Sequence, residues 1–166
     1  LDGADILRVA RAAGVDAIHP GYGFLSENPD FAQAVIDAGL KWVGPSPQVM
    51  RVLGNKVAAR EAAVAAGVSV MPATPPLPAD LDACREWAER IGFPVMLKAS
   101  WGGGGRGMRV IERAADLEGA LAAARREALS AFGNDEVYFE KLVSRARHVE
   151  VQILGDLHGN LVHLFE

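Results

Sequence analysis

The sequence has little cysteine, few aromatic residues and no excess of positive charge, and these absences exclude several classes of protein. Cys84 is the only cysteine among 166 residues, which excludes an intramolecular disulfide framework and favours a reducing compartment such as the cytoplasm. The net charge is −4, and no basic run is present that could follow a nucleic acid. No apolar run approaches the roughly 18 residues of a membrane span. We therefore expect no nucleic-acid or membrane partner.

Half of the residues are hydrophobic, which is enough for a sizeable core in one or two domains. The chain starts at Leu1 without a methionine and stops at Glu166 within a strand-like pattern. We therefore interpret it as a fragment of a longer protein, in which a missing targeting segment means little.

The first part of the chain alternates between helical and strand-like patterns. Apolar residues recur at helical spacing over residues 5–13 and again after Asn28, which with the following proline is a typical helix start. Strand-like runs follow at residues 15–18 and 41–43. This order predicts a parallel sheet covered by helices. The loop at residues 19–27 leaves the carboxyl end of a strand, where such sheets bind ligands.

Two side chains in that loop are candidates for binding. His19 could be a ligand or an acid/base group, but a histidine in this place more often ties down its own loop, and we favour that interpretation. Tyr22 lies between Gly21 and Gly23, which leave space around it for a ligand.

The middle of the chain predicts two more helices, at residues 47–53 and 56–66, and a brief strand at 68–70. Four prolines follow within residues 72–78, a density that excludes a helix or a central strand. We interpret this segment as a stiff connection at a domain boundary. The rest of the chain predicts an α+β unit, with helices at 81–91 and 117–132 and strands at 94–97, 108–111, 137–143, 147–154 and 161–165.

A glycine-rich segment separates two of these strands and has five glycines within residues 102–107. Its backbone N–H groups can surround phosphate oxygens, and Lys98 adds a fixed positive charge. Gly102, Gly104 and Gly107 match the dinucleotide pattern G-x-G-x-x-G, but a strand follows them instead of a helix. A Walker A loop is excluded because its lysine follows the glycines. A flap over a nucleotide remains, with a flexible hairpin as the alternative.

The predicted strand at 147–154 has three polar side chains on one face, those of His148, Glu150 and Gln152. Such a face borders either solvent or a polar site, and the residues alone favour solvent.

Together these strings resemble the biotin carboxylase component of biotin-dependent carboxylases, which are ATP-grasp enzymes. The resemblance covers the whole chain in the right order. It rests on five strings: His19–Glu27, Gly54–Lys56, Lys98–Arg109, Glu140–Lys141 and Arg147–Glu150. Within the family, residues 53–60, 98–101, 131–133 and 163–166 are most similar to the bacterial pyruvate carboxylases, although acyl-CoA carboxylases share the core motifs.

The resemblance implies a fold that is α/β and α+β. Residues 1–44 would be the end of a Rossmann-like N-terminal (pre-ATP-grasp) domain, and 45–70 the connecting helices. Residues 71–142 would form the ATP-grasp lid, which closes over ATP, and 143–166 the start of the C-terminal ATP-grasp subdomain.

The resemblance also implies roles for single residues. Lys56 and Lys98 would hold the ATP phosphates. The remaining ATP-binding residues would be Gly104, Gly105 and Met108 in the flap, Glu140, Lys141, Leu142 and Val143 in a hinge that binds adenine largely through backbone groups, and His148. Tyr22 and Gly23 would lie near the ureido ring of biotin. The family's catalytic residues and metal carboxylates lie beyond Glu166, so no metal ligand is expected here.

The implied activity is ATP-driven formation of carboxyphosphate from bicarbonate, followed by carboxylation of biotin, within an enzyme that converts pyruvate to oxaloacetate. It requires Mg²⁺ or Mn²⁺ and biotin on a carboxyl carrier domain outside this segment, with a carboxyltransferase domain in a homo-oligomeric parent. The isolated chain is expected to be inactive. Alternatives are an acyl-CoA carboxylase subunit, a carbamoyl-phosphate or purine-pathway ATP-grasp ligase, and a nucleotide-binding module without turnover. The string at 19–27 argues against the other ligases.

Overall fold

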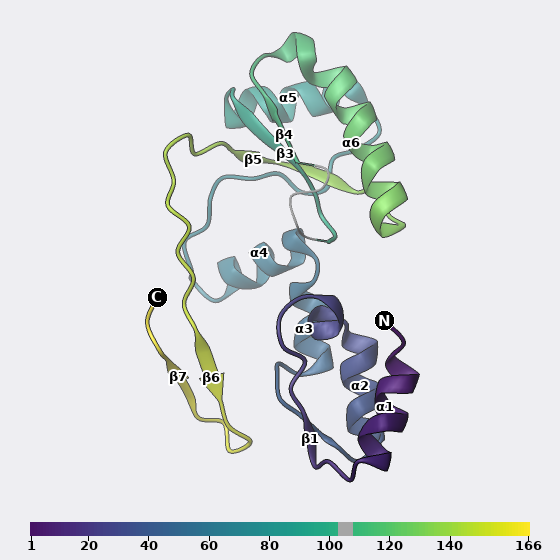
Figure 1. The fold of residues 1–166 in the computed structure, drawn as a ribbon. Helices are drawn as coiled ribbons and strands as arrows, with labels where there is room; N and C mark the ends of the chain where they lie inside the picture. The colour runs from purple at the N-terminus through teal and green to yellow at the C-terminus, as the bar shows by residue number, and fades with distance from the viewer. Residues whose placement is uncertain (103–107) are drawn as a thin grey trace.

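The computed structural model describes residues 1–102 and 108–166, and Figure 1 shows how their helices and strands are arranged. The α-helices are α1 (Gly3–Ala12), α2 (Pro29–Asp37), α3 (Pro47–Leu53), α4 (Lys56–Ala65), α5 (Leu81–Ile91) and α6 (Leu117–Phe132). The strands are β1 (Ala17–Ile18), β2 (Lys41–Trp42), β3 (Val95–Ala99), β4 (Arg109–Ile111), β5 (Val137–Lys141), β6 (Ile153–Gly155) and β7 (Leu161–His163). None of the helices in the described ranges has the length and apolar character needed to cross a bilayer.

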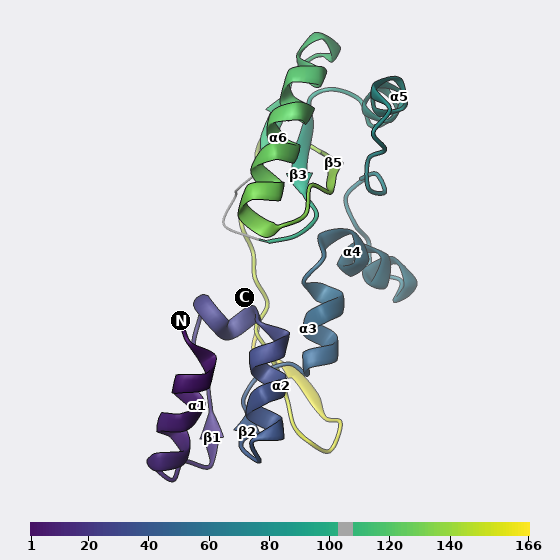
Figure 2. The same cartoon turned by 90° about the vertical axis from the view of Figure 1, so that its right-hand side faces the viewer.

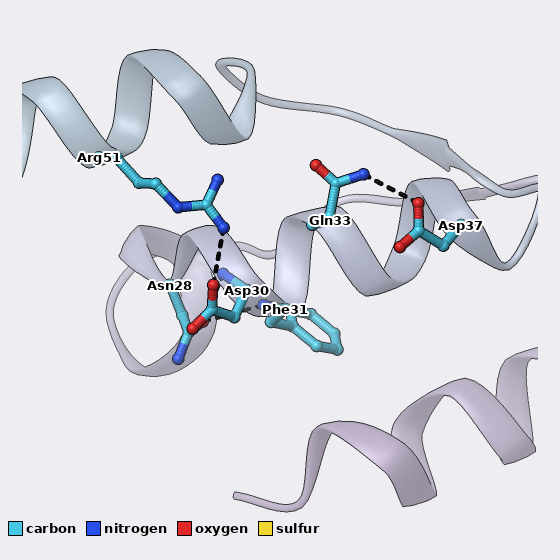
Figure 3. Close-up of polar contacts among 6 residues, drawn as sticks. All are labelled: Asn28, Asp30, Phe31, Gln33, Asp37 and Arg51. Carbon is cyan, nitrogen blue, oxygen red and sulfur yellow. Dashed lines mark hydrogen bonds and ion pairs between the residues drawn. The ribbon is translucent and has the colours of Figure 1, made fainter.

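The first part of the chain has the predicted parallel arrangement, because β1 pairs with β2 in the same direction. Asn28 begins α2, and its Oδ1 accepts hydrogen bonds from the backbone N–H groups of Asp30 and Phe31 at 3.0 and 2.9 Å (Figure 3). Arg51 of α3 forms an ion pair with Asp30 at 2.7 Å. The start of α2 is therefore attached to α3, which leads directly into α4.

The second part has a three-stranded antiparallel sheet with the strand order β4-β3-β5. Side chains alternate between the two faces of β3, so Val95, Leu97 and Ala99 are buried while Met96 and Lys98 are only partly covered. The buried face packs against α5 and α6 in one hydrophobic core. The opposite face of the sheet is turned toward α4, which lies between the sheet and α3 (Figure 1).

The proline-rich segment is part of this sheet and is more than the stiff connection that the sequence predicted. The backbone N–H groups of Thr74 and Leu77 donate to the carbonyl groups of Phe139 and Val137 at 2.9 and 2.8 Å. Lys141 in turn donates to the carbonyl group of Pro72 at 2.8 Å. The segment can lie on this edge of the sheet because prolines are tolerated at sheet edges.

The strand predicted at residues 68–70 is wrong, since the described structure has no strand there. The backbone N–H of Val68 donates to the carbonyl of Ala63 at 2.9 Å and thereby closes the end of α4. A short apolar run can form a strand only when another strand lies beside it, which the local sequence does not reveal.

The strand predicted at 147–154 starts later than expected, at Ile153, and residues 147–152 are exposed and irregular. Among the residues described here, Gln152 exchanges backbone hydrogen bonds with Leu164 and Phe165, at 2.9 and 3.1 Å. On the N-terminal side of Gln152, residues 147–151 keep the alternating pattern, but within the described ranges no strand lies beside them. The β6–β7 hairpin lies at the opposite end of the molecule from α5 and α6, as the two views in Figures 1 and 2 show.

The attachment of the proline-rich segment can be tested at Thr74. Its side chain is fully buried, and its Oγ1 accepts a hydrogen bond from the backbone N–H of Phe139 at 3.0 Å. Thr74→Val keeps the shape but leaves this N–H unsatisfied, so we expect the free energy of unfolding to fall by about 1–3 kcal/mol. Urea denaturation measures the change. Thr74→Ser keeps the hydroxyl and is the control. An unchanged free energy of unfolding in Thr74→Val, with a loss in Thr74→Ser, would show that the methyl group, and not the hydrogen bond, stabilises the segment.

Candidate functional site

The outer face of the sheet has a charged pair at its centre. Lys98 on β3 and Glu140 on β5 both point away from the core, and the Nζ of Lys98 contacts the Oε1 of Glu140. The two side chains are 21% and 23% exposed, so the pair is largely shielded from water but still accessible. Lys98 therefore lies where the sequence predicted it, at the end of the strand that leads into the glycines.

A second lysine lies beside this pair although it is 42 positions away in the chain. Lys56 is the first residue of α4, and its backbone N–H donates to the carbonyl of Ser100 at 2.8 Å. Its Nζ contacts the carbonyl oxygen of Gly102. Burial lowers the pKa of Lys56, the charge of Lys98 lowers it further, and Glu27 acts in the opposite direction. The two lysines thus form a site where an added negative charge would be favourable.

Glycine is required at position 102 for two reasons. Its φ angle is +78°, a conformation that other residues rarely adopt. A Cβ atom there would also lie 2.1 Å from the ring of Phe132. The chain can therefore turn close to α6 and still present its carbonyl oxygen to Lys56.

Tyr138 supports the charged pair from the same face of the sheet. It is almost completely buried, and burial raises the pKa of its hydroxyl, as do the charge of Glu140 and a hydrogen bond to it. Arg60 of α4 acts in the opposite direction. Glu140 therefore has Lys98 as its ion-pair partner and Tyr138 as a close polar neighbour on the same face of the sheet.

The other predicted ATP-binding residues are spread over several separate segments of the chain. Met108 is exposed just before β4, while Gly104 and Gly105 lie outside the described residues. Lys141 ends β5, and its Nζ donates to the carbonyl of Gly92 at 2.7 Å, on the far side of the sheet from Lys98. The half-buried Leu142 and the exposed Val143 follow. Their backbone roles in binding adenine stay a prediction.

The remaining predicted residues do not reach the lysine pair. His148 is 81% exposed and contacts only Glu150 among the described residues, at 2.9 Å, so this polar face borders solvent in the structure. Tyr22 is 90% exposed, and Gly23 beside it is also exposed. The Nδ1 of His19 accepts from the backbone N–H of Gly21 at 3.0 Å, which confirms that this histidine ties down its own loop.

Four residues near the lysines were not among those predicted: Glu27, Asn55, Arg60 and Tyr138. Tyr138 could have been found from strand alternation, because it shares a face with Glu140 two residues later. Asn55 precedes a helix and was recognisable as a cap. Glu27 and Arg60 act through their charges on residues far away in the sequence, for which the sequence contains no local signal.

The described residues contain no ready-made cluster of side chains that would hold a divalent cation on their own. In the ranges 1–102 and 108–166, no three histidine, cysteine, aspartate or glutamate side chains converge as metal ligands do. No metal-dependent step is assigned to them.

Two family models match the chain, one after the other. Residues 1–50 match the N-terminal domain of biotin carboxylase. Residues 55–166 match the ATP-binding domain of the carbamoyl-phosphate synthase L chain. The border between the two matches lies next to Lys56 and the start of α4.

Relatives with known names match nearly the whole chain. Mitochondrial pyruvate carboxylase of Mus musculus is 53% identical over 98% of this chain, and pyruvate carboxylase of Staphylococcus aureus is 48% identical over 97% of it. The chain spans 14% of the length of these relatives.

Solved structures of the same kind superimpose well. Rhizobium etli pyruvate carboxylase is 60% identical, with a TM-score of 0.88 over 99% of this chain and 14% of that one. A Campylobacter jejuni biotin carboxylase in complex with β,γ-ATP is 44% identical, with a TM-score of 0.92 over 98% of this chain and 36% of that one. The biotin carboxylase domain of Hydrogenobacter thermophilus 2-oxoglutarate carboxylase, in complex with MgADP and bicarbonate, is 39% identical, with a TM-score of 0.90 over 98% and 36%.

The sequence and the fold therefore give the same assignment. The two family matches follow each other in the order of a biotin carboxylase, and the structure has the mixed α/β and α+β composition of its ATP-grasp neighbours. The chain belongs to the biotin carboxylase family of ATP-grasp proteins, within which it resembles the pyruvate carboxylases of bacteria and animals.

Proposed function

We propose that this chain is the part of a biotin carboxylase that holds the phosphates of ATP, within a pyruvate carboxylase. The observation that carries the proposal is the proximity of Lys56 and Lys98, one from α4 and one from β3, next to the glycine-rich segment. The nucleotide complexes of the Campylobacter jejuni and Hydrogenobacter thermophilus relatives support it.

The two lysines have a direct chemical role in this proposal. In the structure, the charge of Lys98 is balanced by Glu140, and the Nζ of Lys56 contacts the carbonyl oxygen of Gly102. For Lys56 a phosphate oxygen is a stronger partner than the neutral carbonyl of Gly102, because the contact is then charged on both sides. For Lys98 a phosphate oxygen would replace one anionic partner, Glu140, by another. Cations held around a transferring phosphoryl group stabilise the charge that develops on it. The lysines therefore both bind the nucleotide and lower the barrier to transfer.

The proposed reaction of the whole protein has two steps. Bicarbonate attacks the γ-phosphoryl group of ATP, which gives carboxyphosphate and ADP. The carboxyl group is then transferred to a nitrogen of biotin on a carrier domain, and phosphate is released. In this proposal residues 140–143 bind adenine, His148 and Met108 contact the nucleotide together with Gly104 and Gly105, and Tyr22 and Gly23 lie near biotin. The divalent cation, Mg²⁺ or Mn²⁺, neutralises phosphate charge when bound.

We further propose pyruvate as the final carboxyl acceptor, through a carboxyltransferase domain of a cytoplasmic homo-oligomer. The identity to Rhizobium etli pyruvate carboxylase is 60%, compared with 39% to the 2-oxoglutarate carboxylase, which supports pyruvate. We propose the same division of the chain into subdomains that the resemblance implies: residues 1–44, the connecting helices at 45–70, the lid at 71–142 and the start of the C-terminal subdomain at 143–166.

The role of Lys98 can be tested by its removal. In the full-length protein, Lys98→Ala removes a charge-assisted contact to phosphate worth about 1.5–3 kcal/mol, so we expect the Kd for ATP to rise roughly 10- to 150-fold. Isothermal titration with ATP measures it. Lys41→Ala removes an exposed lysine on β2 and is the matched control. An unchanged Kd for Lys98→Ala would exclude Lys98 from the site.

The lowered pKa of Lys56 predicts a pH dependence of ATP binding. Burial and Lys98 favour the neutral amine in the free protein, whereas bound phosphate favours the charged form. As the pH rises through this lowered pKa, binding must increasingly be accompanied by proton uptake, and the affinity for ATP falls before an ordinary lysine would lose its proton. We expect Lys56→Arg, which stays charged, to show a flatter profile over the same alkaline range. Identical profiles for both proteins would contradict the role of Lys56.

The proposal also predicts that the chain alone does not complete the reaction. The described residues do not provide a cluster of metal ligands, and positioning of reactants accounts for roughly 7–11 kcal/mol of such barriers. We expect no ATP hydrolysis dependent on biotin and bicarbonate by residues 1–166, measured beside the full-length protein. Turnover near the full-length rate would show that all essential groups lie within this chain.

A further inference from the structure

Asn55 uses both ends of its side-chain amide, and this distinguishes it from an ordinary helix cap. It is 8% exposed, and its Oδ1 accepts from the backbone N–H groups of Val57 and Ala58, each at 2.9 Å. Two backbone donors on one atom identify that atom as the oxygen. The Nδ2 at the other end donates to the Oε1 of Glu136 at 3.2 Å.

This hydrogen bond closes a ring of contacts around the lysine site. The backbone carbonyl of Glu136 accepts from the N–H of Ser100 at 3.0 Å, and the carbonyl of Ser100 accepts from the N–H of Lys56 at 2.8 Å. Asn55 also forms an isolated β-bridge with Trp101. The start of α4, the end of β3 and the entry to β5 are thus joined at one point, directly beside Lys56 and two residues beyond Lys98.

The capping role alone does not explain an asparagine at this position. Aspartate, serine or threonine would accept the same two backbone hydrogen bonds. Aspartate has no donor, and a serine or threonine hydroxyl would have to donate from the same oxygen that accepts from the helix, whereas an amide presents its acceptor to the helix and its donor to Glu136 on separate atoms. An aspartate here would cap α4 equally well but place a second carboxylate against that of Glu136. The choice of asparagine therefore reflects the contact with Glu136.

We propose that the Asn55–Glu136 hydrogen bond is a positioning contact that holds Lys56 at its distance from Lys98, in the arrangement that phosphate binding requires. The inference rests on the proposed ATP function, and Asn55 acts through Lys56 without touching the nucleotide. A tether is needed because two ammonium groups repel each other at short range, and more strongly where water is partly excluded. Without it, fewer contacts hold the start of α4 to the end of β3, chiefly the backbone hydrogen bond from Lys56 to Ser100.

A swap of donor and acceptor separates this role from capping. Asn55→Asp keeps the helix cap and removes the donor. Glu136→Gln keeps an acceptor oxygen for the amide of Asn55. In the double variant Asn55→Asp/Glu136→Gln, the amide of Gln can donate to the new carboxylate, so the bond is restored in the reverse direction with the same total charge. Glu136→Ala removes the bond, and Asp135→Ala, at the exposed neighbouring residue, is the matched control.

We expect the Kd for ATP of the full-length protein to rise about tenfold for Asn55→Asp and for Glu136→Ala, the size expected for residues that act as a coupled pair. Glu136→Gln, the double variant and Asp135→Ala should stay near the wild-type value. Thermal unfolding identifies a temperature at which all variants are folded, and the titrations are made below it. A double variant as weak as Asn55→Asp would overturn the proposal.

A second measurement needs no nucleotide. Loss of the carboxylate in Glu136→Ala would by itself lower the pKa of Lys56, whereas movement of Lys56 away from Lys98 and into water would raise it. We expect a rise, measured as the pH dependence of Lys56 modification by an amine-selective reagent with mass-spectrometric detection. A fall would overturn the positioning role. If the wild-type protein binds no ATP, the proposed function fails, but this titration still decides whether the contact positions Lys56.

Discussion

The close approach of two lysine side chains is the constraint on which this structure depends. Burial lowers the pKa of Lys56, and the like charge of Lys98 lowers it further, so both the loss of water and the repulsion make the charged form of Lys56 costly. The surrounding contacts offset it in part. Glu140 balances Lys98, Gly102 provides a carbonyl oxygen to Lys56, and the backbone of Ser100 fixes the start of α4. A protein stores such repulsion only when its structure is held together elsewhere.

The sheet provides that support through a division of its two faces. Its inner face is a continuous apolar core with α5 and α6, and this core fixes the backbone of β3 and β5. The outer face can therefore present Lys98, Tyr138 and Glu140 without a loss of order. The proline-rich segment adds hydrogen bonds along the free edge of β5, including the buried one from Phe139 to Thr74. The core thus stabilises the same two strands that carry the charged groups.

Local signals in the sequence predicted most of the elements but not their neighbours. The cap at Asn28 and the helical spacing of α5 and α6 depend on residues close together in the chain, and the structure has these elements where they were expected. Residues 68–70 and 147–151 have strand-like patterns, but in the described ranges no strand lies beside them, and such pairing depends on distant segments. The same reason explains why Glu27 and Arg60 were missed. No local pattern relates Lys56 in α4 to Lys98 in β3. Only the resemblance to the biotin carboxylases predicted that both lysines belong to one phosphate site.

The Lys98–Glu140 ion pair also sets the free-energy cost of phosphate binding, because a phosphate oxygen has to replace Glu140 as the partner of Lys98. An ion pair between largely shielded side chains contributes little net stability, because the loss of hydration offsets much of the attraction. Exchange of Glu140 for a phosphate oxygen therefore costs little, provided that Glu140 retains a partner afterwards. Tyr138 supplies one, since its buried hydroxyl stays within hydrogen-bonding reach of the carboxylate. A free carboxylate left in the site would repel the nucleotide, whereas one held by Tyr138 on β5 remains satisfied while Lys98 turns toward phosphate. The buried tyrosine and the accessible lysine are thus two parts of one arrangement, in which the carboxylate is anchored and the cation is exchangeable.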